Sequence, residues 1–156
     1  TNNGTITWTA GQIQMVKATI NNNAAFTAQP DNSFGNFGGT NAFNNNAAGT
    51  FTRNTGTGQL DIGIPFVNTG SLAVNTGNLR LTGTGSSTGT INVAAAATLT
   101  FQNNFDVTAG SFTVAGTLSL PGEVPREIAV EEIHDVLRRH FDLAIPHDAK
   151  LRCFAP

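Results

Sequence analysis

The chain has 156 residues, of which only 12% are charged, and its formal net charge at pH 7 is −2. This balance lacks the basic patch that nucleic acids or anionic membranes attract, so we expect it to bind neither. The single cysteine, Cys153, excludes an internal disulfide, and no apolar run reaches the roughly 18 residues that a membrane-spanning helix needs.

One five-residue motif recurs along the first three quarters of the chain. It consists of a small residue, usually Gly, then a polar residue, then an apolar, any and another apolar residue. This alternation is the period of a β-strand, in which one side chain points in and the next points out. The motif predicts strands within 4–8, 11–15, 49–53, 58–62, 70–74, 77–81, 89–93, 97–101, 110–114 and 116–120.

The spacing of the motif predicts a repeat of about 20 residues. From Gly49 onward, every second start lies 19 to 21 residues further on. The longer steps leave room for a third strand, and two of them contain one, at Ile64 with Phe66 and at Phe105 with Val107. We therefore expect a parallel β-solenoid with three faces and about six turns, roughly 29 Å tall at about 4.8 Å per stacked strand.

The stretch between Ala28 and Phe43 fits the repeat less well. Phe26 is expected in a strand one turn after the first motifs, and the following glycines and phenylalanines predict an enlarged turn with a loop bulging around 30–39. Together with outward-facing threonines, this loop forms a candidate contact surface. Its members are Phe34, Phe37, Thr5, Thr7, Thr50 and Thr52.

Stacked turns should align like residues in the core and at the corners. Two interior columns are expected, one of Phe51, Leu72, Ile91 and Phe112 and the other of Leu60, Leu79, Leu99 and Leu118. Gly before each strand should supply the positive φ of a corner, and Asn, as at 44–46 and 68, should bond the turn above through its amide. Apolar residues in register favour this fold over the disorder that Gly, Asn and Thr richness alone would suggest.

The segment from Gly49 to Phe101, with phrases such as FVNTGSL and GTINVAAAATLTF, resembles the repeats of large secreted bacterial β-helix proteins of the filamentous-haemagglutinin and autotransporter-adhesin kind. The resemblance covers roughly residues 1–120. It implies a right-handed parallel β-helix that forms a stalk or adhesive rod outside the cell, with no cofactor, and it transfers no functional residues. Because the pattern is already running at Thr1, we expect an excised or mature fragment whose export signal lies upstream.

We expect neither catalysis nor a metal site in the repeat. Hydrolysis of polysaccharides needs two or three convergent carboxylates, whereas Asp31, Asp61 and Asp106 are scattered. Asp61 and Arg80 hold equivalent outward positions one turn apart, which predicts a surface ion pair. The acidic nonapeptide that binds calcium between solenoid turns is missing.

A different kind of segment follows Gly122, so we divide the chain into a solenoid, 1–122, and a C-terminal segment, 123–156. Early Glu and late Arg residues after Pro125 predict a short α-helix, followed by short extended pieces in LAIP and KLRCF. The segment has three possible roles: a cap on the last turn, a docking helix for a partner chain, or a foreign sequence. The helix would pack through Ile133, Val136, Leu137 and Phe141.

These observations predict a structural and adhesive module of a secreted or surface-displayed bacterial protein, with no enzymatic activity. Its lateral faces and loops would make weak contacts with glycans, cell surfaces or other copies of itself. One alternative is an ice-binding solenoid, because T-x-T pairs occur at Thr5 with Thr7 and at Thr50 with Thr52, although Ser71 replaces Thr one turn on. The other is a non-catalytic fragment of a polysaccharide-active β-helix protein.

Overall fold

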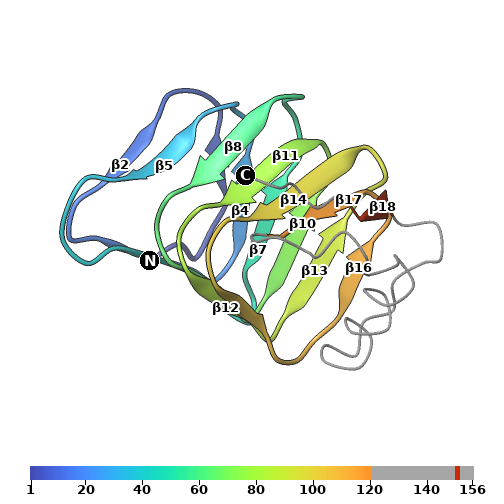
Figure 1. The fold of residues 1–156 in the computed structure, drawn as a ribbon. Coiled ribbons are helices and arrows are strands. Elements are labelled where there is room, and N and C mark those ends of the chain that lie inside the picture. The colour runs from blue at the N-terminus through green and yellow to red at the C-terminus, as the bar shows by residue number, and fades with distance from the viewer. Residues whose placement is uncertain (121–149, 152–156) are drawn as a thin grey trace.

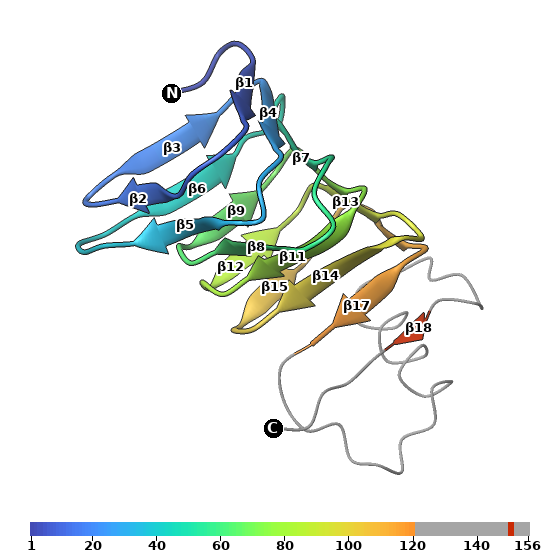
Figure 2. The same cartoon turned by 90° about the horizontal axis from the view of Figure 1, so that it is seen from above.

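The computed structural model describes residues 1–120 and Lys150–Leu151. These residues form a rod of stacked parallel β-strands and contain no α-helix (Figures 1 and 2). Each of the first five turns contributes three strands, and the sixth contributes two. The prediction of an all-β parallel solenoid with about six turns is therefore confirmed.

Every complete turn adds one strand to each of three sheets. Sheet 1 contains β1 (Ile6–Trp8), β4 (Ala25–Ala28), β7 (Thr50–Arg53), β10 (Ser71–Val74), β13 (Thr90–Val93) and β16 (Phe112–Val114). Sheet 2 contains β2 (Ile13–Met15), β5 (Ser33–Asn36), β8 (Gln59–Ile62), β11 (Gly77–Leu81), β14 (Ala97–Phe101), β17 (Thr117–Ser119) and β18 (Lys150–Leu151). Sheet 3 contains β3 (Thr19–Asn22), β6 (Ala42–Asn45), β9 (Phe66–Asn68), β12 (Gly85–Ser87) and β15 (Phe105–Val107).

Each of the ten motif segments contains a strand, and the two expected third strands are β9 and β15. A further third strand, β12, had not been predicted because its sequence, GSS, has no apolar residue. Its inward residue is Ser87, which is fully buried and accepts a hydrogen bond of 3.0 Å from Asn68 Nδ2. A polar side chain with its own partner thus replaces the expected apolar one.

The two interior columns are confirmed. In sheet 1, Leu72 pairs with Phe51 on one side and Ile91 on the other. In sheet 2, Leu79 has the same relation to Leu60 and Leu99. All members of both columns are buried, so like side chains fill the narrow interior from turn to turn.

The prediction for the second turn was partly wrong. This turn is enlarged, since Phe26 pairs with Phe51, 25 residues later, whereas Leu72 pairs with Ile91 only 19 residues later. No loop bulges out across 30–39, however, because β5 lies within that range. Phe34 is fully buried, with its ring centroid 4.8 Å from that of Trp8. The additional residues lie at the three corners of this turn, at 29–32, 37–41 and 46–49.

Close packing, more than positive φ, requires glycine at the corners. Among the glycines that begin a motif, Gly11, Gly77 and Gly110 have positive φ, and the others do not. At Gly89 a Cβ would lie 2.1 Å from the carbonyl oxygen of Gly70 in the preceding turn. The expected role of glycine is therefore corrected: at most of these corners it lets one turn approach the next.

An asparagine ladder runs inside the corner between sheets 3 and 1, as expected for the amides. Asn2 donates to Asn22 at 2.6 Å, Asn22 to Asn45 at 2.8 Å, and Asn45 to Asn68 at 2.8 Å, in each case from Nδ2 to Oδ1. All four side chains are buried. We call these four residues the inner ladder; each amide also donates to a backbone carbonyl at the start of a sheet 1 strand, so the ladder ties the turns together.

Little of the C-terminal segment can be described. Lys150–Leu151 forms β18, which pairs in parallel with β17 through Leu118 and Leu151. The predicted helix, with Ile133, Val136, Leu137 and Phe141, and also Cys153, lie outside the described residues. In the described part of the chain, no helix is long and apolar enough to cross a membrane.

Candidate binding face

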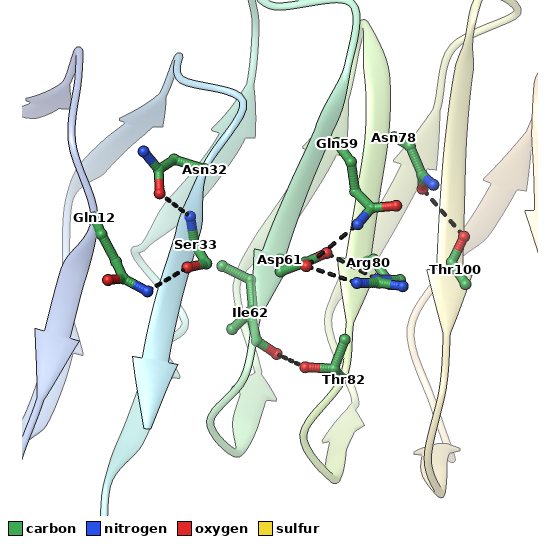
Figure 3. Close-up of polar contacts among 10 residues, drawn as sticks. All are labelled: Gln12, Asn32, Ser33, Gln59, Asp61, Ile62, Asn78, Arg80, Thr82 and Thr100. Carbon is green, nitrogen blue, oxygen red and sulfur yellow. Dashed lines mark hydrogen bonds and ion pairs between the residues drawn. The ribbon is translucent and has the colours of Figure 1, made fainter. Parts of the chain in front are cut away.

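Polar side chains from successive turns lie along the outer side of sheet 2, and most of them are drawn in Figure 3. This row arises because the apolar residues of each strand point inward and leave the alternate positions to face solvent. We call this row the polar stripe. Its members are Gln12, Ser33, Gln59, Asp61, Asn78, Arg80, Thr98 and Thr100.

The centre of the polar stripe is an ion pair between Asp61 and Arg80. Arg80 donates from Nε to Oδ1 at 2.8 Å and from Nη2 to Oδ2 at 2.7 Å, so the planar groups meet through two parallel bonds. Gln59 Nε2 adds a third bond to Oδ2 at 3.2 Å. The hydrogen bond from Arg80 to Asp61 raises the guanidinium pKa above its ordinary value, so Arg80 keeps its positive charge at neutral pH.

This pair was predicted from the equivalent positions of the two residues, and the register confirms it. Both side chains are partly open to solvent, 27% for Asp61 and 29% for Arg80. An ion pair this exposed contributes under about 1 kcal/mol to stability. The pair therefore contributes little to the stability of the fold, but it holds charged groups in fixed positions on the surface.

Other bonds within the polar stripe hold its ends. Gln12 Nε2 donates to Ser33 Oγ at 2.7 Å, and Thr100 Oγ1 donates to Asn78 Oδ1 at 3.1 Å (Figure 3). These bonds join side chains of neighbouring turns, which are 21 and 22 residues apart in the sequence. The polar groups are thus oriented before any ligand arrives, which lowers the entropy cost of binding.

An open depression of about 490 Å³ lies beside the polar stripe, at the N-terminal ends of β8, β11 and β14 in sheet 2. Gln59, Asn78 and Thr98 belong to both the stripe and this depression. The hydroxyl of Thr76, which also lines it, is buried and has no hydrogen-bond partner among the described residues. The remaining lining residues are Thr57, Gly58, Gly77 and Ala96.

Phe37 places an aromatic ring at the N-terminal end of the same face. Its side chain is 50% exposed, and a Cβ at Gly35 would lie only 2.2 Å from Phe37 Cε2. The ring therefore lies over the backbone of β5, where the absence of a side chain at 35 makes room for it. The same Cβ would lie 3.1 Å from Gln12 Nε2, so the ring adjoins the polar stripe.

The structure does not bring the predicted contact residues together as one surface. Phe34 is a core residue without exposed area, which corrects its assignment to a surface loop. Phe37 lies beside sheet 2. The threonines lie along sheet 1: Thr5 immediately before β1, Thr7 within it, and Thr50 and Thr52 in β7.

Sequence reasoning missed an ion pair between Asp31 and Arg53. Arg53 occupies an inward position, and its guanidinium donates to the Asp31 carboxylate and to the carbonyl oxygens of Gln29 and Pro30. The only available signal was a charged residue at the second apolar position of the motif GTFTR. This pair joins the corners of two successive turns, and Asp31 also accepts a bond from the backbone N–H of Gly58.

The carboxylates of the described residues do not gather into a metal cluster. These residues contain no group of three or more His, Cys, Asp or Glu side chains placed to hold an ion. Asp31 and Asp61 each bond a different arginine, and Asp106 lines a separate depression of about 300 Å³ near Phe101. The three aspartates thus have different surroundings in the fold.

Comparisons with protein-family models, with curated proteins and with solved structures found no match for this chain.

Proposed function

We propose that this chain is a rigid right-handed rod of a secreted or surface-displayed bacterial protein, which binds neutral glycans through the polar stripe of sheet 2. The observation that carries the proposal is the Asp61 and Arg80 pair, flanked by Gln59 and adjoining the depression. We propose a right-handed rod because connections between parallel strands of one sheet are almost always right-handed. The assignment to a bacterial surface is supported by the resemblance of the repeat.

The polar stripe has the chemistry that sugar hydroxyls need. A sugar hydroxyl both donates and accepts hydrogen bonds, and here the Asp61 carboxylate accepts, the Arg80 guanidinium donates, and the amides of Gln59 and Asn78 do both. Polar groups in fixed positions determine the orientation in which a ligand binds. The exposed ring of Phe37 offers a flat apolar platform for the carbon face of a sugar.

The charges of the stripe favour a neutral ligand. Asp61 and Arg80 neutralise each other, and every other member of the stripe is uncharged. An acidic or sulfated glycan would therefore meet no excess positive charge to attract it. A neutral polysaccharide can instead exchange its bonds to water for bonds to the stripe.

The proposed binding is weak and suits multivalent adhesion. The depression and the stripe are open to solvent, so a short saccharide keeps much of its surface in water. Affinity then rises when several sites act on one polymer, because each later contact is intramolecular. A rod with a continuous lateral face can present such contacts along its length.

Titration of isotope-labelled protein with neutral oligosaccharides, followed by NMR, tests this function. We expect shifts concentrated at residues 59–61 and 78–80, and binding weakened about tenfold, roughly 1.4 kcal/mol, in Arg80→Gln. Thr113→Ala, an exposed change on sheet 1, is the matched control and should bind as the native chain does. Unchanged binding by Arg80→Gln, or no binding of any neutral glycan by the native chain, would contradict the proposal.

A further inference from the structure

The outer side of sheet 1 carries an uncharged array of small side chains. One column runs through paired positions of successive strands as Thr7, Thr27, Thr52, Ala73, Asn92 and Thr113. A second column, two residues earlier in each strand, contains Ala25, Thr50, Ser71 and Thr90. We call these two columns the hydroxyl array.

The side chains of the hydroxyl array are not bonded to one another. None of their hydroxyl or amide groups makes a side-chain hydrogen bond to any residue between 1 and 120, whereas the polar stripe of sheet 2 is internally bonded. Thr7, Thr50, Thr90 and Thr113 are exposed, and Thr27 and Thr52 are half-buried. The hydroxyls are therefore available to water.

The inner ladder holds the array rigid from beneath. The amides of Asn22, Asn45 and Asn68 donate to the carbonyl oxygens of Thr50, Ser71 and Thr90, which are the residues of the second column. These bonds are 3.1, 2.9 and 3.2 Å long. Each row is fixed to its neighbours by the ladder in addition to the sheet, so the array keeps a constant repeat.

That repeat has two dimensions. Strands stack about 4.8 Å apart, and outward residues within a strand are about 6.6 Å apart. Each threonine of the array places a methyl group and a hydroxyl side by side. Water can therefore be ordered over the methyl groups and held by hydrogen bonds to the hydroxyls. Charged groups would orient water in their own way, and the array has none.

We propose that the hydroxyl array orders water in an ice-like layer and binds the surface of ice. The binding centre is the run of Thr7, Thr27 and Thr52, which occupy successive strands in register. Ala73 continues the run with a methyl group, and Asn92 ends it because its amide is larger and exposed. This function is separate from glycan binding, which uses another face of the rod.

Partitioning of the full chain into a slowly growing ice front, with inhibition of ice recrystallisation as a second readout, tests the proposal. The native chain should enter the ice, and Thr52→Arg should be excluded from it, because a long charged side chain prevents flush contact. Ser86→Arg, which places the same group on the outer side of sheet 3, should partition like the native chain. Circular dichroism checks that all three remain folded.

A second variant is expected to strengthen ice binding instead of removing it. Asn92→Thr replaces the amide that ends the run and connects Ala73 to Thr113 through another threonine, so recrystallisation should stop at a lower protein concentration than for the native chain. Exclusion of the native chain from ice, or equal partitioning of folded Thr52→Arg, would overturn the proposal. If Thr52→Arg does not fold, no gain in Asn92→Thr would overturn it. A native chain that avoids ice but binds a crystalline polysaccharide through sheet 1 also overturns it.

Discussion

Arg53, whose side chain is completely buried, is bonded to Asp31, whose side chain is 44% exposed. The guanidinium also donates to the carbonyl oxygens of Gln29 at 2.8 Å and Pro30 at 2.6 Å, whereas its Nε has no partner among the described residues. The other carboxylate oxygen of Asp31 accepts a bond of 3.1 Å from Gly58 N. One buried cation therefore joins the corners of two successive turns.

This arrangement predicts that removing the anion costs more than removing the cation. Asp31→Asn leaves a buried guanidinium without a counter-ion and should lower the free energy of unfolding by about 2 to 3 kcal/mol. Arg53→Met places an apolar side chain in register with Ala28 and Val74 and should cost less, because Asp31 can turn to water. Urea denaturation followed by circular dichroism measures both.

Asp61→Asn provides the control for this comparison. It removes a carboxylate from the exposed pair with Arg80 and should change stability by under about 1 kcal/mol. If Asp31→Asn were as mild as Asp61→Asn, or milder than Arg53→Met, the corner would not depend on the buried charge.

Asn45 makes three side-chain hydrogen bonds: a buried one to Asn22, a buried one to Asn68, and a part-buried one to the carbonyl of Ser71. Asn45→Ala leaves one N–H of the Asn22 amide, whose other N–H still donates to Thr50, and the Oδ1 of Asn68 without partners. Two buried unsatisfied groups should lower the free energy of unfolding by roughly 3 kcal/mol. Thermal unfolding by circular dichroism should give a clearly lower Tm.

Asn44→Ala is the matched control, because Asn44 is the neighbouring residue in the same strand. Its side chain faces outward and donates a single bond of 2.9 Å to Asn21 Oδ1. We expect a loss of about 1 kcal/mol or less. Equal Tm values for the two variants would mean that the inner ladder does not stabilise the rod.

The sequence predicted the strands in which apolar inward positions recur at the regular period. It did not predict β5, although Phe34 is buried there, because the enlarged second turn breaks the period. Leu79 and its column follow the period, so the strands and their register could be read directly. The sequence also did not reveal the inward polar residues that have a dedicated partner. Ser87 in β12 is bonded by Asn68, and Arg53 in β7 is bonded by Asp31; a hydrophobic pattern does not record either.

Among the candidate site residues, those placed by the repeat were predictable from the sequence, and those placed by irregular corners were not. The pairing of Asp61 with Arg80 follows from one turn of the repeat, so the sequence indicated it. The position of Phe37 depends on the corner after β5 and on the space above Gly35, and neither follows from periodicity. Phe34 and Phe37 look alike in the sequence, yet one is buried and the other is exposed.

Glycine positions make a prediction about steric fit. A Cβ at Gly89 would lie 2.1 Å from the Gly70 oxygen, so Gly89→Ala must push two turns apart and should cost about 1 to 3 kcal/mol. Gly4→Ala is the control, because a Cβ there meets nothing within 4 Å. Thermal unfolding should separate the two variants, and a harmless Gly89→Ala would contradict the close stacking of these corners.

The last turn makes a prediction about the C-terminal segment. β18 pairs with the edge of β17 through Leu118 and Leu151, and an uncovered edge strand is a site for pairing with other chains. A chain of residues 1–122 lacks β18, so we expect it to keep its strand signal in circular dichroism but to aggregate, whereas the full chain stays monomeric in sedimentation. A truncated chain that is monomeric while the full chain associates would instead identify the segment as a docking element. Leu151→Pro, which removes a backbone donor within β18, should reproduce part of the aggregation in the full chain.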